Sequence, residues 1–129
     1  MKKEKKVDIK YLGIPNICFS VTEKKDKREK KYIKQRINRG FDDSETWNLD
    51  GTIAEFIIPR LKVFKTKLHG YPGDLTEESW NEIIDKMILA FELNLSNKYD
   101  WDKRASTEND AKIQEGLDLF AKYFRHLWD

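Results

Sequence analysis

Two pairs of acidic residues have a spacing that would serve metal-dependent chemistry. Glu82 and Asp85 lie three residues apart in one predicted helix, and Glu115 and Asp118 repeat that spacing in another. Carboxylates three residues apart share one helix face, where their oxygens can bind a divalent cation. With Glu78 they would suit hydrolysis of a phosphate chain. Among 23 acidic residues such pairs also arise by chance, so a solvated helix face is the favoured interpretation.

A third candidate is a carboxylate in an apolar position. Asp50 falls on the same predicted helical stripe as Trp47 and Ala54, so we expect it to be buried and to contact either a cation or several hydrogen-bond donors. Gly51 beside it would let a ligand or a second backbone approach closely. A buried structural salt bridge or a cap is favoured over a ligand contact, because ion-pair networks also perturb such groups.

Aromatic and basic residues, together with Asp50, lie near the N-terminus of one predicted helix. Such a mixture is typical of a recognition patch. The predicted binding residues are Arg36, Arg39, Asp43, Trp47, Asp50 and Arg60.

The other residue types indicate binding rather than catalysis. Cys18 lies in an apolar run and is interpreted as a core residue, while His69 and His126 are too few for a soft-metal site. The chain has no Walker sequence, dinucleotide fingerprint or Ser–His arrangement. We therefore predict no catalytic residue, metal or cofactor.

Charge is distributed unevenly along the 129 residues. Residues 1–40 hold 14 Lys and Arg against 5 Asp and Glu, a balance of +9, and residues 41–129 have a balance of −7. For the basic run 24–39 a solvated face is favoured over contact with nucleic-acid phosphates. The arm would otherwise lie against its own acidic body. No apolar run approaches the roughly 20 residues of a membrane helix, so no membrane partner is expected.

Periodicity and capping residues predict a mainly α fold. We expect a hairpin at 7–22, and a helix across 43–68 that is bent or broken at Gly51 or Pro59. Asp42 and Glu45 form a predicted capping box. The apolar stripe of this helix comprises Trp47, Ala54, Ile57, Ile58, Leu61, Phe64 and Leu68.

Two further helices complete the predicted bundle. Thr76 suits the N-cap of the first, with Leu75 and Trp80 as a hydrophobic staple. The predicted apolar face of this helix comprises Trp80, Ile83, Ile84, Met87, Phe91 and Leu95. A loop over 94–107, with Tyr99 and Trp101 docked on the core, precedes a last helix at about 107–127. Its predicted apolar face comprises Ile113, Leu117, Phe120, Phe124 and Leu127. The prediction is a single domain over 1–129: a small bundle of three to four helices, with a basic arm at 1–40 and an acidic helical body at 41–129.

Several segments resemble a known group of sequences. They are Arg39–Asp50, Ile53–Lys62, Gly70–Gly73, Trp80–Met87 and Glu115–Phe120. In order and spacing they resemble a family of small proteins of unassigned function from tailed bacteriophages and prophages, over residues 39–127. The resemblance implies a phage setting and a place in the host cytoplasm, and it carries no catalytic residue across.

Three hypotheses follow. The leading one is a non-enzymatic phage accessory, host-takeover or anti-defence protein that binds a host protein, a nucleic acid or a nucleotide signal. The first alternative is a Mg²⁺-dependent all-α nucleotide pyrophosphohydrolase that uses the acidic pairs. The second is nucleic-acid binding by the basic N-terminal arm. The oligomeric state is left open.

Overall fold

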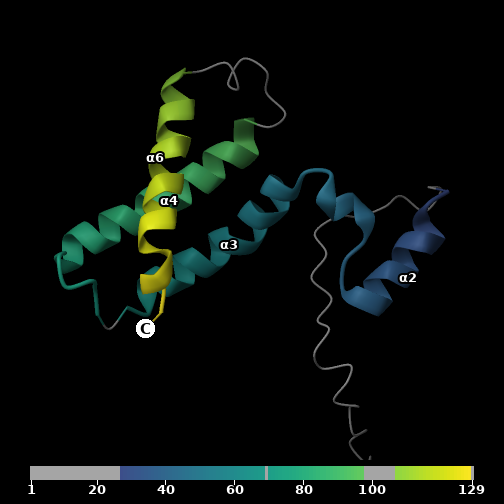
Figure 1. Ribbon diagram of the computed structural model, residues 1–129, viewed down its shortest axis with the longest axis horizontal. Coiled ribbons are helices and arrows are strands. Elements are labelled where there is room, and N and C mark those ends of the chain that lie inside the picture. The colour runs from purple at the N-terminus through teal and green to yellow at the C-terminus, as the bar shows by residue number, and fades with distance from the viewer. Residues whose placement is uncertain (1–26, 69, 98–106, 129) are drawn as a thin grey trace, which may run out of the picture. The chain divides into compact units, whose positions relative to one another are not determined.

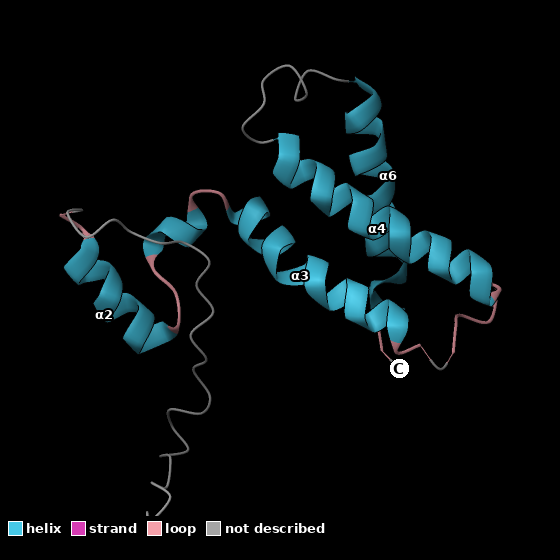
Figure 2. Cartoon of the chain, turned by 180° about the vertical axis from the view of Figure 1, so that it is seen from behind, coloured by secondary structure: helices cyan, strands magenta, loops and turns pink. Residues whose placement is uncertain are grey.

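Helices make up nearly all of the described structure. The computed structural model describes residues 27–68, 70–97 and 107–128. Its α-helices are α2 (Glu29–Arg39), α3 (Leu49–Thr66), α4 (Glu77–Asn97) and α6 (Thr107–Tyr123) (Figure 1). Short 3₁₀ helices follow α2 at Asp43–Thr46 and α6 at Phe124–His126. The predicted mainly α bundle is confirmed, and within the described ranges every regular element is helical (Figure 2).

Two predicted features fall in other parts of the chain. The hairpin at 7–22, including Cys18, lies outside the described residues, as do Tyr99 and Trp101. None of the described helices combines the length and the apolar character that crossing a membrane requires.

The chain divides into two compact units. The first unit comprises Met1–Thr52 and the second unit Ile53–Asp129, so the division falls within the first turns of α3. Residues 41–52 cluster with α2, although the sequence pattern groups them with the helical body.

The core of the second unit is built on the inward face of α4. Trp80, Ile84, Met87 and Phe91 are all buried on this helix, at the three-to-four spacing that the sequence predicted. Edge-to-face ring contacts join α4 to α6, between Trp80 and Tyr123 at 5.5 Å and between Phe91 and Phe120 at 5.3 Å. From α3, the core receives Ala54, Ile57, Ile58, Leu61, Phe64 and Leu68.

A glycine sets the closest approach between α4 and α6. A Cβ at Gly116 would lie 2.3 Å from the Ala90 Cβ and 2.4 Å from the Lys86 carbonyl oxygen. Both distances are far below van der Waals contact, so only glycine fits here without a shift of backbone. The ribbons of α4 and α6 cross in Figure 1.

The start of α4 follows its predicted capping chemistry. The Thr76 Oγ1 accepts a hydrogen bond from the Ser79 backbone N–H at 3.1 Å, and the Thr76 N–H donates to the Ser79 Oγ at 2.9 Å. Ser79 thus takes the reciprocal role of the acid in a capping box. Leu75 and Trp80 both pack in the core, as a hydrophobic staple requires. Glu77 and Glu78 occupy the first turn, where the helix dipole favours acids.

The predicted helix over 43–68 is wrong at its start. Residues 43–46 form a 3₁₀ turn, α3 begins only at Leu49, and Trp47 lies before the helix with 58 % of its surface exposed. The helix neither breaks at Gly51 nor ends at Pro59, which lies inside it. Directly after Pro59, the Arg60 guanidinium donates to the carbonyl oxygen of Phe56, four residues earlier, at 2.8 Å.

The predicted apolar face of α6 is also partly wrong. Leu117 and Phe124 are exposed, whereas Gly116 and Tyr123 are buried. The buried face is rotated toward Gly116 because the close crossing with α4 requires the glycine to point inward. In addition, α4 continues to Asn97, into the segment predicted as a loop.

Candidate functional site

Helix α2 carries the cations of the candidate site and ends at a glycine. Its sequence consists of good helix formers, with Glu29 in the first turn and Arg36 and Arg39 in the last, as the helix dipole favours. Gly40 has φ 86°, and its N–H donates to the Arg36 carbonyl oxygen at 2.9 Å. This left-handed C-cap turns the chain back along α2 and brings residues 41–47 beside it.

A fully buried carboxylate fixes the returning segment to α2. Asp42 is 0 % exposed, and its Oδ2 accepts from the Arg36 Nε at 2.7 Å and pairs with the Arg36 Nη2 at 2.6 Å. Its Oδ1 accepts hydrogen bonds from the Ser44 backbone N–H, at 2.9 Å, and from the Ser44 hydroxyl. Burial alone would raise the pKa of Asp42, but the Ser44 and Arg36 contacts outweigh it and lower this pKa.

Asp43 makes a second set of contacts with the same helix. Its carboxylate accepts from the Gln35 amide at 2.9 Å and from Arg39 at 2.6 Å, and it lies 3.4 Å from the Lys31 Nζ. The Asp43 N–H in turn donates to the Gln35 side-chain oxygen at 2.9 Å. The hydrogen bond from Gln35, followed by that from Arg39, lowers the pKa of Asp43 to about 2.

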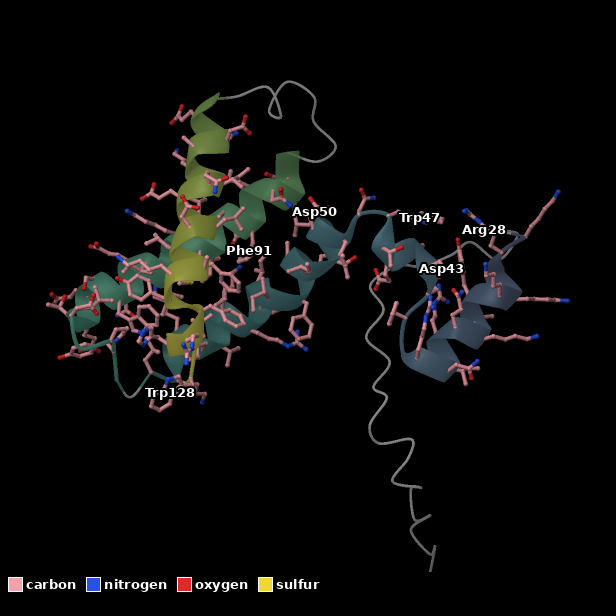
Figure 3. All side chains as sticks on the ribbon, viewed as in Figure 1. Arg28, Asp43, Trp47, Asp50, Phe91 and Trp128 are labelled. Carbon is pink, nitrogen blue, oxygen red and sulfur yellow. The ribbon has the colours of Figure 1, made fainter. Side chains whose placement is uncertain are left out.

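Trp47 is held in place and yet exposed. Its ring meets the Tyr32 ring edge to face at 6.3 Å, and the Arg28 guanidinium lies 4.9 Å from its centroid. Tyr32 is buried, so it provides a fixed support for the exposed indole. Figure 3 labels Arg28, Asp43 and Trp47 within the first unit.

Five of the six predicted binding residues belong to the first unit, and Arg60 belongs to the second. Arg36, Arg39, Asp43 and Trp47 lie in the α2 and 41–47 segments of the first unit. The predicted burial of Asp50 is wrong, because this residue is exposed in the first turn of α3. There it suits the positive end of the helix dipole.

Arg60 belongs to the second unit and makes local contacts. Its guanidinium lies 3.8 Å from the Phe56 ring centroid and donates to the Phe56 carbonyl oxygen. These contacts fix the arginine on its own helix.

The predicted capping box at the start of this segment is half correct. Asp42 caps the 3₁₀ turn as described, but Glu45 is buried and its side chain meets Thr52 instead, with the Thr52 Oγ1 3.2 Å from the Glu45 Oε2. The Thr52 hydroxyl also donates to the Glu45 carbonyl oxygen at 2.9 Å. This contact ties the 3₁₀ turn to the first turn of α3.

The acidic pairs of the hydrolase hypothesis lie on solvated helix faces. Asp85 pairs with the Lys65 Nζ at 2.7 Å, and Glu115 pairs with the Lys86 Nζ at 2.7 Å. The hydrogen bond that Lys86 donates to the Glu115 carboxylate raises the pKa of Lys86. Asp118 accepts from the Gln114 amide at 2.7 Å. In the described ranges, no group of three or more His, Cys, Asp or Glu residues is placed to hold a metal ion.

Three residues outside the predicted set complete the candidate site. They are Arg28, at the N-cap of α2, and Tyr32 and Gln35 within it, and together with the predicted Arg39 they recur at intervals of three to four residues. This spacing places them on one helix face, which is the face that contacts residues 41–47. The periodicity was therefore visible in the sequence, although it involves mostly polar side chains.

The two aspartates predict an acid transition in the first unit. A carboxyl group whose pKa is lower in the folded state stabilises the fold above its unfolded pKa, near 4, and this contribution is lost as the pH falls through the folded value. We therefore expect the Trp47 indole N–H resonance to move toward its unfolded position between about pH 4 and pH 2, the folded pKa of Asp43 being about 2. Nuclear magnetic resonance of the full chain measures this.

Matched variants identify the responsible carboxylates. Asp43→Asn should reduce the acid transition of the first unit, whereas Asp110→Asn, an exposed change on α6, should leave it unaltered. An identical transition in both variants would contradict the assignment to Asp43.

Comparison with family models, curated proteins and solved structures finds no match to this chain. The resemblance to small phage proteins stays a prediction. The first unit combines a cationic helix, two aspartates that are hydrogen-bonded to that helix, and an exposed indole that packs on a buried tyrosine.

Proposed function

We propose that the chain is a non-enzymatic, phage-type accessory protein that binds a component of the host cell through the first unit. The observation that supports this proposal is Trp47, a ring with fixed neighbours that remains 58 % exposed. A large aromatic side chain in this state adds nothing to a core of its own, and such side chains dominate the energy of recognition surfaces.

Other apolar side chains close to Trp47 in the sequence are also exposed. Ile33, Ile37, Phe41 and Leu49 are all exposed in the described part of the first unit. Groups of exposed apolar residues rimmed by charges are typical of interaction sites. A host-takeover or anti-defence role would use such a surface, because it acts by occupying a host component rather than by chemistry.

Quantitative affinity capture from a bacterial host tests the proposal. The tagged full chain, Trp47→Ala and Trp128→Ala are compared for bound protein, nucleic acid and nucleotide. Trp128 is the matched control, because it is an exposed tryptophan of the second unit. We expect a component that is retained by the wild type and by Trp128→Ala and is depleted at least severalfold by Trp47→Ala. Equal capture by both variants would contradict the proposal.

Incubation with a nucleotide panel and Mg²⁺ separates this proposal from the hydrolase hypothesis. A binding protein leaves the nucleotides intact. Hydrolysis that Glu82→Gln abolishes would contradict the proposed function and establish the enzyme instead.

A further inference from the structure

The described part of α2 carries an unusual density of positive charge. Residues 27–39 contain seven Lys and Arg and one Glu, a balance of +6. Arg36 and Arg39 are engaged by Asp42 and Asp43, and Lys31 lies 3.4 Å from Asp43. Lys27, Lys30 and Lys34 are therefore the cations that a partner would meet.

Three lysines are exposed to solvent, one in the turn just before α2 and two within the helix. Lys27, Lys30 and Lys34 are exposed, and none of the ion pairs within residues 27–52 includes them. At a rise of about 1.5 Å per residue, they cover roughly 10 Å along the helix. Phosphates of a single strand recur every few ångströms, so this row can meet two or three of them.

A stacking platform accompanies the lysines. Arg28 lies 4.9 Å from the Trp47 ring centroid and 5.5 Å from that of Tyr32, and it follows Lys27 directly in the chain. Indole rings and guanidinium groups are the side chains on which unpaired bases stack. Ring and cations therefore occur together on one small unit.

From the presence of both features in the first unit we propose that the partner is single-stranded nucleic acid, with a base stacked on Trp47 and Arg28 and phosphates at Lys27, Lys30 and Lys34. The inference rests on the proposed function and names its partner class. The charge balance favours a nucleic acid over a protein, because a protein partner would need a matching concentration of acids. Duplex nucleic acid is disfavoured because its bases are already stacked and cannot cover the indole.

Fluorescence anisotropy with labelled oligothymidylate of 20 nucleotides tests the proposal on the full chain. Binding should weaken with salt, with a slope of log K against log salt of about −2 for three phosphate contacts on a single strand. Lys30→Gln and Lys34→Gln should each lower the slope by roughly 0.7. Trp47→Ala should weaken binding about tenfold, whereas Trp47→Phe, which retains a ring, and Trp128→Ala should change it little.

An abasic oligonucleotide of equal length isolates the stacking contact. It should bind the wild type about tenfold more weakly than oligothymidylate, yet bind Trp47→Ala with the same affinity as oligothymidylate does. Equal affinities of the wild type for both strands, tighter binding of a duplex, or no binding at about 50 mM salt would each overturn the proposal.

The outcomes distinguish this inference from the proposed function. If Trp47→Ala loses a captured host protein while oligothymidylate does not bind, single-stranded nucleic acid is refuted and the binding function stands. If Trp47→Ala and Trp128→Ala retain the same host components and the same oligonucleotide affinity, the nucleic-acid inference and the proposed binding function are both refuted.

Discussion

Replacing Trp80 by alanine is expected to destabilise the second unit by about 3–5 kcal/mol, the usual cost of truncating a buried aromatic side chain. Trp80 is 1 % exposed and packs against Tyr123, so the change removes contacts that join α4 to α6. A loss of this size is comparable to the total stability of many small domains. Urea denaturation followed by circular dichroism at 222 nm measures it on the full chain.

Trp128 provides the matched control for this substitution. It is 74 % exposed, so Trp128→Ala should change the free energy of unfolding by no more than about 0.5 kcal/mol. Similar midpoints for the two tryptophan variants would contradict the position of Trp80 in the core.

Gly116→Ala is expected to destabilise the second unit by about 2 kcal/mol, within the range that overpacking causes. Alanine favours a helix over glycine by about 1 kcal/mol, so this substitution would be stabilising if the site were open. The clash with Ala90 and the Lys86 carbonyl oxygen reverses that sign. The same denaturation experiment gives the direction directly.

Two further variants define the cause of this effect. Gly70→Ala should be close to neutral, since nothing lies within 4 Å of a Cβ there. Combining Gly116→Ala with Ala90→Gly should recover part of the loss, because the Ala90 Cβ is removed while the backbone contact remains. Stabilisation by Gly116→Ala alone would show that α4 and α6 do not cross closely at this glycine.

Local sequence signals predicted the features that depend on neighbouring residues. The Thr76 cap, the Leu75–Trp80 staple and the inward face of α4 all follow from short-range spacing, and the structure confirms them. The end of α2 at Gly40 is a local feature of the same kind, because glycine tolerates a positive φ. Such interactions are nearly complete within one or two helical turns.

The predictions were wrong where one element determines at which residue another begins or which of its faces is buried. The stripe through Trp47 and Asp50 assumed a helix from residue 43, but the 3₁₀ turn over 43–46 delays the helix to Leu49. On α6, the crossing at Gly116 turns Leu117 outward, which the apolar pattern of that helix alone cannot reveal.

The candidate site was only partly predictable for the same reason. Arg36, Arg39, Asp43 and Trp47 were identified from residue type, but their partners depend on how the chain folds back after Gly40. The Arg28–Trp47 contact joins residues 19 positions apart across that turn, and no local pattern specifies it.

Hydrogen exchange of the full chain, with and without saturating oligothymidylate, tests most directly whether the first unit is the contact surface. The account predicts slower exchange of backbone amides within residues 27–52 and unchanged exchange in α4 and α6. Protection of α4 or α6 without protection of α2, or no change anywhere at saturation, would contradict it.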